Sequence, residues 1–486
     1  MNHAFFKALY IILISLGLAF IFNFLFFAKE IGISILIFST ILLGAVFLFG
    51  LYQRLSFKKV WWLILFILFF ALMPGIRANE FLTFLNICAT LGLLMLLAHG
   101  LAGTPIFLMK LRDYLILILL VPLKMLSRAL SAISLIGQIR STVKHHDVWL
   151  RIVKGIVMAI PILIIFSILF SQADLAFSRF INSFVTITIS KHTIQYLVLL
   201  FFAFVASLSF ISYIFIPGKI EGAVSDERPP VTLDSGRGME VLIFLGLISV
   251  LFLVFIGFQI TYLFGGETNI VNAGFTYAEY ARRGFWELLT VGILSLLILL
   301  ASEKHARAES KDKKFLIHAL IMIAEVIIVI ASAFKRLSLY IDVYSLTELR
   351  FYAAGFIILL LVLFILLAVK LIKAKREHFF TFGTLLSAIA FLVIVNIMNP
   401  DAFIARSNLK QYGRIDKIDV LYVGKLSADA TLEKIKLYEK IEGEDKKALR
   451  ELFQNQKDRL QKNNTNWRSA NVSRIRALRL LDGLGE

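Results

Sequence analysis

Long apolar stretches recur through most of the chain, and each is close to the length that a membrane-spanning helix requires. A helix needs roughly 20 apolar residues to cross about 30 Å of hydrocarbon. Hydrophobic residues make up 59% of the 486 residues and charged residues only 17%, a composition that excludes a water-soluble globule. The sequence therefore predicts an all-α, polytopic membrane protein.

Measured against that length, the chain is expected to cross the membrane about eleven times. The predicted spans are 5–27, 31–51, 60–73, 81–98, 152–170, 194–216, 241–264, 285–301, 315–334, 351–369 and 379–398. Between the fourth and fifth spans, Pro122, Lys124 and Arg128 interrupt an apolar run. Residues 114–139 are therefore predicted to be re-entrant or to lie in the membrane interface.

Basic residues set the orientation, because they concentrate in the short cytoplasmic loops of membrane proteins. Placing the N-terminus in the cytoplasm puts most basic residues of the short loops on the cytoplasmic side. An odd number of crossings then leaves the C-terminal tail outside the cytoplasm. The net charge of +18 fits contact with an anionic membrane surface, and nucleic-acid binding is not needed to explain it.

The tail from residue 399 onward is charge-rich and has apolar positions at helical spacing in 432–441, 446–460 and 467–481. This pattern predicts three amphipathic helices. Asp429 or Thr431 is expected to cap the first helix, and Gly443 separates it from the second. The predicted parts are a four-helix membrane part (1–113), an interfacial segment with a basic loop (114–154), a seven-helix membrane core (155–398) and a soluble helical tail (399–486).

Four polar segments fall at the predicted outer ends of the spans: 171–177, 276–287, 336–350 and 399–412. Their charged side chains include Asp174, Glu279, Arg282, Arg283, Glu287, Arg336, Asp342, Glu348, Arg350, Asp401 and Arg406. One interpretation is that these groups line a shared polar cavity. The other is that they are ordinary capped helix ends flanked by interfacial aromatic residues.

Two of these segments carry a hydroxyl residue three positions before a glutamate. Thr276 precedes Glu279, and Ser345 precedes Glu348. This spacing is typical of a capping box, in which the two side chains bind the free backbone donors at a helix start. Both pairs are therefore predicted to begin helices.

Glu325 lies near the middle of a predicted span, where a bare carboxylate costs at least a few kcal/mol. His318, Glu325, Ser332 and Arg336 follow at spacings that keep them on one stripe of a helix. The stripe has two interpretations. It is a packing surface in which a protonated Glu325 hydrogen-bonds to a neighbouring helix, or it is a path for a proton or a substrate.

Several catalytic patterns are missing from the sequence. It has no phosphate-binding glycine loop, no HExxH, no GxSxG and no paired cysteines, since Cys88 is the single cysteine. His145, His146 and Asp147 contain metal-binding side chains, but adjacent residues on a basic loop are more typical of a solvated surface. We therefore expect no cofactor and no bound metal.

The polar segments also carry a resemblance to a known family. The sequences concerned are SQADLAF at Ser171–Phe177, FTYAEYARRGFWEL at Phe275–Leu288, RLSLYIDVYSLTELR at Arg336–Arg350, NPDAFIARSNL at Asn399–Leu409 and LSADA at Leu426–Ala430. Over roughly Pro161 to Ala430 the chain resembles a bacterial membrane family catalogued as domain of unknown function 4173, which is related to family 4153. The resemblance implies a multi-pass bacterial membrane protein of unassigned activity.

The leading functional hypothesis is an inner-membrane transporter or ligand-responsive membrane protein with an outward polar site and Glu325 beneath it as a protonatable group. One alternative is a membrane-embedded enzyme that acts on an envelope lipid or glycan, with carboxylates as acid or base. Another is a scaffold or sensor accessory whose tail binds an envelope protein. The expected partners are the lipid bilayer and a small-molecule, lipid or envelope-protein ligand, and no nucleic acid.

Overall fold

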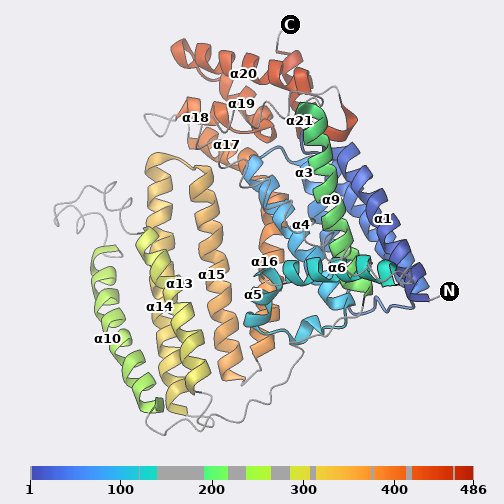
Figure 1. The fold of residues 1–486 in the computed structure, drawn as a ribbon. Coiled ribbons are helices and arrows are strands. Elements are labelled where there is room, and N and C mark those ends of the chain that lie inside the picture. The colour runs from blue at the N-terminus through green and yellow to red at the C-terminus, as the bar shows by residue number, and fades with distance from the viewer. Residues whose placement is uncertain are drawn as a thin grey trace, which may run out of the picture.

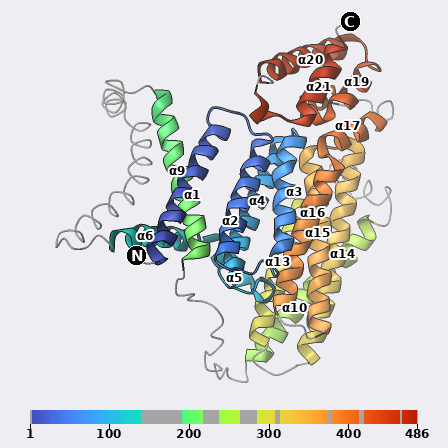
Figure 2. The same cartoon turned by 90° about the vertical axis from the view of Figure 1, so that its right-hand side faces the viewer.

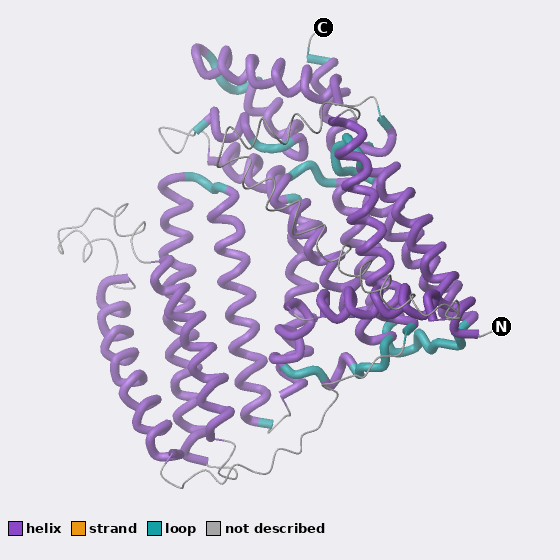
Figure 3. Tube along the Cα trace, viewed as in Figure 1, coloured by secondary structure: helices purple, strands orange, loops and turns teal. Residues whose placement is uncertain are grey.

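The computed structural model describes residues 3–119, 121–138, 191–216, 237–263, 285–306, 313–373, 377–411, 419–463 and 466–484. Within these ranges every regular element is a helix and no strand occurs, which confirms the predicted all-α fold (Figures 1 and 3). Nine of the described helices are long and apolar enough to cross a membrane. They are α1 (His3–Phe26), α2 (Ser34–Tyr52), α4 (Glu80–Leu101), α9 (Lys191–Phe215), α10 (Arg237–Leu263), α13 (Phe285–Ala306), α14 (Lys313–Tyr344), α15 (Glu348–Ile372) and α16 (Glu377–Met398).

Two of the eleven predicted spans are not among these nine. Helix α3 (Trp61–Ile76) is apolar but has only 16 residues, and Pro74 lies inside its last turn. It packs between α2 and α4. The predicted span 152–170 lies outside the described residues. The membrane-spanning nature of the chain is therefore established, and the number eleven stays a prediction.

The segment that was expected to be re-entrant or interfacial contains α5 (Leu111–Leu119) and α6 (Val121–Gln138). Helix α6 runs across the bundle instead of along it, in both views (Figures 1 and 2). Its buried residues are Val121, Met125, Ala129 and Ala132, at helical spacing on one face. Because these buried residues lie on one face, the helix packs against its neighbours with that face.

The membrane helices form two groups, each with its own hydrophobic core. The first bundle contains α1 to α4, α9, the short helix α5 and the flat helix α6, with the short helix η1 (Ile106–Leu108). The second bundle contains α10, α13, α14 and α15. Helix α16 joins them, because its Phe380 belongs to the second core and its Ile389 to the first.

Two buried polar pairs link neighbouring helices through direct side-chain contacts, which a low-dielectric interior favours. Asn86 of α4 and Asn396 of α16 exchange side-chain hydrogen bonds of 2.9 and 2.8 Å, and both are fully buried. Lys370 Nζ of α15 lies 2.6 Å from Glu303 Oε2 of α13, also buried. These contacts fix how the helices are paired.

The C-terminal helices cover the end of the bundles opposite to the N-terminus (Figure 1). They are α17 (Pro400–Gln411), α18 (Val420–Lys425), η2 (Ala428–Ala430), α19 (Thr431–Tyr438), α20 (Gly443–Asn463), η3 (Trp467–Ser469) and α21 (Val472–Asp482). Apart from η3, they share a third hydrophobic core with Leu82, Phe351 and Val395 from the membrane helices and Leu346 from the turn between α14 and α15. The C-terminal helices are thus packed on the membrane part.

Two predicted helix caps are wrong. Ser345 does not cap α15: the cap is Thr347, whose hydroxyl accepts from Arg350 N, whereas Ser345 has a φ of +65° in the short turn after α14. Asp429 and Thr431 do not cap α19 either. Its cap position is held by Ala430, without a side-chain hydrogen bond, and Asp429 points instead to the start of α4. Ser345 cannot cap α15 because α14 extends to Tyr344 and Ser345 lies in the turn that follows it. Asp429 cannot cap α19 because it binds Ala78 N instead.

Candidate functional site

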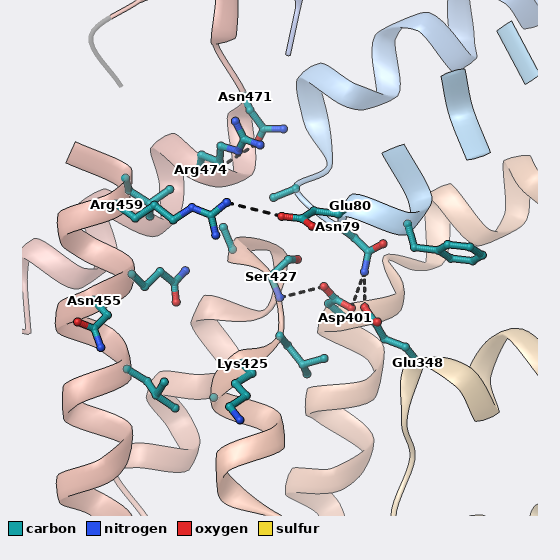
Figure 4. A pocket seen from close by; sticks show the side chains of 18 of the residues that line it. Asn79, Glu80, Glu348, Asp401, Lys425, Ser427, Asn455, Arg459, Asn471 and Arg474 are labelled. Carbon is teal, nitrogen blue, oxygen red and sulfur yellow. Dashed lines mark hydrogen bonds and ion pairs between the residues drawn. The ribbon is translucent and has the colours of Figure 1, made fainter. Parts of the chain in front are cut away.

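Asn79 connects three parts of the fold at the start of α4 (Figure 4). Its Oδ1 accepts a hydrogen bond from Leu82 N at 2.7 Å, which makes Asn79 the N-cap of α4. Its Nδ2 donates to Glu348 Oε1 at 2.5 Å and to Asp401 Oδ1 at 2.9 Å. The residue is only 2% exposed. One amide therefore links the first bundle, the second bundle and the C-terminal helices.

Two aspartates complete this arrangement by accepting hydrogen bonds from backbone donors. Asp401, which is fully buried, accepts from Ser427 N at 3.0 Å. Asp429 accepts from Ala78 N at 2.8 Å and from Asn79 N at 3.1 Å. Burial raises the pKa of Asp429 above its ordinary value. We name the set Asn79, Glu348, Asp401 and Asp429 the polar joint.

A cavity of about 840 Å³ lies beside the polar joint, between the membrane helices and the C-terminal helices (Figure 4). One wall is made by the ends of membrane helices and by α17. It includes Asn79, Glu80, Phe81, Glu348 and Asp401. The opposite wall includes Tyr422, Lys425, Ser427, Asn455, Gln456 and Arg459. Its volume is in the range of small-molecule binding sites.

The charges around the cavity are arranged by sign. The membrane-side wall supplies carboxylates, and the C-terminal wall supplies Arg459 and Lys425. Arg459 lies 3.6 Å from Glu80 Oε1, and both side chains are largely exposed, at 72% and 83%. An exposed ion pair of this kind contributes only about 0 to 1 kcal/mol. An anionic ligand group can therefore replace Glu80 beside Arg459 at little energetic cost.

Lys434 lies behind the C-terminal wall and is fully buried. Its Nζ donates to Leu426 O and to Gln456 Oε1, the latter at 3.2 Å, and both of these residues line the cavity. Burial lowers the pKa of Lys434 to about 8, although nearby Asp401 acts in the opposite direction. The ammonium thus titrates close to neutral pH behind a wall of the site.

Because Lys434 is buried, we expect the free energy of unfolding to depend on pH through this residue. The substitution Lys434→Met should remove that dependence. Between pH 8 and 10.5 the unfolded chain binds more protons at Lys434 than the folded protein does, so stability rises with pH in that window. Between pH 7 and 9.5 the stability of the native protein should rise by about 2 kcal/mol relative to the variant. The measurement is denaturant unfolding in detergent at a series of pH values.

The control for this prediction is Lys447→Met, which removes a lysine that is 74% exposed on α20. Its stability difference from the native protein should not change over the same pH range. If the difference in free energy of unfolding between the native protein and Lys434→Met is also independent of pH, the lysine is not held in a low-dielectric environment.

Only two of the predicted polar-site residues within the described ranges line the cavity, Glu348 and Asp401. Arg350 points elsewhere: its guanidinium donates to Tyr344 O at 2.7 Å and to Ser345 O, and it lies 4.0 Å from the centre of the Tyr340 ring. It therefore closes the C-terminal end of α14, where a cation is favourable.

The remaining predicted residues are dispersed. Arg406 binds Glu433 at 2.8 Å and so joins α17 to α19. Glu287 and Asp342 are exposed and do not line the cavity. Four predicted site residues lie outside the described residues: Asp174, Glu279, Arg282 and Arg283. The predicted capping box of Thr276 and Glu279 also lies there, as do His145, His146 and Asp147. Among the residues that the structure does describe, no group of three His, Cys, Asp or Glu side chains is arranged to hold a metal ion.

The polar stripe on α14 faces α10 over its second half. The Ser249 hydroxyl donates to Glu325 Oε2 at 2.6 Å. Gln259 Oε1 accepts from Ser332 at 2.8 Å and from Arg336 at 3.1 Å. His318 is different, because its Nδ1 lies 2.8 Å from the carbonyl of Lys314 in its own helix. The spacing rule thus identified the shared face of Glu325, Ser332 and Arg336, while the path interpretation stays a prediction.

Four site residues were not predicted: Asn79, Asp429, Arg459 and Arg474. The last of these also lines the cavity, where it pairs with Glu30 at 2.5 Å. Asn79 had a local signal, since an asparagine directly before Glu80 and an apolar run is typical of a helix start. Asp429 belongs to the LSADA segment quoted for the family resemblance, but it was interpreted as a helix cap. The two arginines had no signal, because their place depends on how the C-terminal helices pack on the membrane part.

Comparison with known proteins adds a family and no further relative. A family model described as Domain of unknown function (DUF4153) matches residues 64–437. This range includes every residue of the polar joint. It is the family named above as a relative of family 4173, and the likeness to family 4173 itself stays a prediction. Searches of curated proteins and of solved structures found no match.

Proposed function

The chain belongs to the DUF4153 family, a domain of unknown function, and from the geometry we propose that it is a ligand-responsive multi-pass membrane protein. One observation carries the proposal. A cavity of about 840 Å³ lies between the ends of the membrane helices and the C-terminal helices, with carboxylates on the first wall and basic and amide groups on the second. A ligand in this cavity contacts both the membrane helices and the C-terminal helices.

The ligand that fits these walls is a small zwitterion. Its cationic group would lie near Glu348, which is partly exposed, with Phe81 and Tyr422 supplying aromatic surface. Its anionic group would lie near Arg459, whose ion-pair partner among the described residues is the exposed Glu80. Asp401 is less available, because both of its oxygens already accept hydrogen bonds from Asn79 and Ser427.

The response follows from the position of the cavity. A ligand that bridges both walls binds more tightly when the C-terminal helices are packed on the membrane part than when they are apart. Such a differential affinity shifts the population toward the packed state. The protein would then report ligand on one side of the membrane through the packing of its C-terminal helices.

We further propose a bacterial cytoplasmic membrane, with the N-terminus inside and the C-terminal helices outside. Two features support this orientation. The N-terminus and the C-terminal helices lie at opposite ends of the bundles (Figure 1). The loop between α2 and α3, which is at the N-terminal end, carries Arg54, Lys58 and Lys59, as expected of a cytoplasmic loop.

A thermal-shift screen of the full chain in lipid nanodiscs tests the proposed ligand class. We expect a member of a panel of amino acids and phosphorylated amines to raise the melting temperature, since a ligand at 100 times its Kd stabilises the folded state by about 2.7 kcal/mol. Arg459→Gln should abolish most of this shift, because it removes the cation beside which the anionic group binds.

The matched control is Arg450→Gln, which removes an exposed arginine of the same helix that does not line the cavity. It should keep the full shift. The proposal is wrong if no zwitterion in the panel stabilises the native protein, or if the two variants lose the shift equally.

A further inference from the structure

The edge of the C-terminal helices next to α1 leaves large apolar side chains uncovered. Trp467 and Val472 are 58% and 60% exposed. The Trp467 ring lies 6.5 Å from the ring of Phe24, which is itself 54% exposed near the end of the spanning helix α1. Because α1 crosses the membrane, its last turn marks the boundary between hydrocarbon and headgroups. Trp467 therefore lies at the level where tryptophan is enriched in membrane proteins.

Short contacts hold this edge in place against α1 and the loop that follows it. Arg468 Nη1 donates to Phe24 O at 2.5 Å, and its guanidinium lies 4.2 Å from the centre of the Phe24 ring. Ile33 N donates to Ala470 O at 3.0 Å. The position of Trp467 relative to the end of α1 is thus set by hydrogen bonds on both sides of it.

Helix α21 presents two further cations on the same side as Val472. Val472, Arg476 and Arg479 are exposed and follow at spacings of four and three residues, which places them on one stripe of the helix. The acidic residue of α21, Asp482, is paired with Lys457 at 2.9 Å. The stripe therefore combines Val472, at the end nearest α1, with two arginines that are not the ion-pair partners of Asp482.

We propose that η3 and α21 lie in the headgroup layer of the leaflet where α1 ends, and that Arg476 and Arg479 bind the phosphates of anionic phospholipids. Trp467 and Val472 then lie at the hydrocarbon boundary, continuous with the exposed surface of Phe20 and Phe24 on α1. That continuity favours lipid over a protein partner, since the surface beside the stripe is already lipid-facing. This inference is independent of any ligand in the cavity.

Hydrogen exchange of the full chain in two kinds of nanodisc tests the lipid contact. We expect the amides of residues 466–484 to exchange about 30-fold more slowly in phosphatidylglycerol-containing nanodiscs than in pure phosphatidylcholine, because both arginines are attracted to the anionic surface. Arg476→Gln combined with Arg479→Gln should remove the difference between the two bilayers. Lys447→Gln combined with Arg450→Gln, the same charge change on the outer helix α20, should preserve it (Figure 2).

A second measurement covers the apolar part of the contact. Brominated phosphatidylcholine should quench a component of the tryptophan fluorescence that is missing in Trp467→Phe. The proposal is overturned if exchange is equal in both bilayers, if both double variants behave alike, or if the bromolipid quenches the native protein and Trp467→Phe to the same extent.

Discussion

Asn79→Ala is expected to lower the free energy of unfolding by about 3 to 5 kcal/mol. The change removes an N-cap, which contributes about 1 kcal/mol, and leaves two carboxyl oxygens without the donor that now binds them. Because those oxygens belong to Glu348 and Asp401, the loss affects the second bundle and α17 as well as α4. Denaturant unfolding in detergent measures the size of the effect.

Asn455→Ala is the matched control, since it makes the same chemical change at an exposed asparagine that lines the cavity. A surface substitution of this kind usually changes stability by no more than about 0.5 kcal/mol. Similar losses for the two variants would contradict the role of Asn79 as the residue that connects the three parts.

Asn79→Asp separates the loss of the donor from a general packing defect. The aspartate keeps the shape and the cap oxygen, but it places a third carboxyl group against Glu348 and Asp401. Because like charges at this separation repel, the variant should be less stable than Asn79→Ala at pH 7. It should recover stability as the pH is lowered, since protonation restores a donor. A loss that is independent of pH would indicate a packing defect.

The second large effect is expected for Gly32→Ala. A Cβ at this position would lie 2.6 Å from Ala470 O and 2.7 Å from the carbonyl carbon and oxygen of Ser469. The obstacle is backbone, so it cannot rotate away as a long side chain would. Residues 469–470 must move, and the hydrogen bond from Ile33 N to Ala470 O is strained or lost. We expect a destabilisation of about 2 to 4 kcal/mol from overpacking and the lost hydrogen bond.

Hydrogen exchange locates the effect of Gly32→Ala. The amides of residues 466–484 should exchange faster in the variant, while those in the middle of α4 and α16 should be unchanged. Gly44→Ala provides the control, because nothing lies within 4 Å of a Cβ built at that helical glycine. It should be neutral or stabilise the protein by up to about 1 kcal/mol through helix propensity. Uniformly faster exchange throughout the chain would argue against a local clash.

The fold class was predictable because a membrane span is a local property of the sequence. Twenty apolar residues in a row have few alternatives to a helix, and the spans around Glu325 and Asn396 were placed correctly on this basis alone. Helical spacing also identified the face shared by Glu325, Ser332 and Arg336. Where the apolar run was interrupted, at Pro122 and Lys124, the pattern predicted a segment that is re-entrant or lies in the interface, and α6 runs across the bundle there.

The site was less predictable because its parts are distant in the chain. Glu348 and Asp401 were identified as charged groups at the outer ends of predicted spans, but Arg350, only two residues from Glu348, closes the end of α14 instead. Asp429 was assigned a local role as a cap, and the structure shows it bonded to Ala78, 351 residues away. No local pattern carries that information.

The polar joint also has a consequence for the order in which the protein is made. Asn79 leaves the ribosome 322 residues before Asp401, so the first bundle enters the membrane long before its partners for Nδ2 exist. Until Glu348 has been made, 269 residues later, the amide must be satisfied by water or by lipid headgroups. A chain truncated before α15 would lack both partners of that amide, and quality-control proteases would encounter it as an incomplete membrane protein.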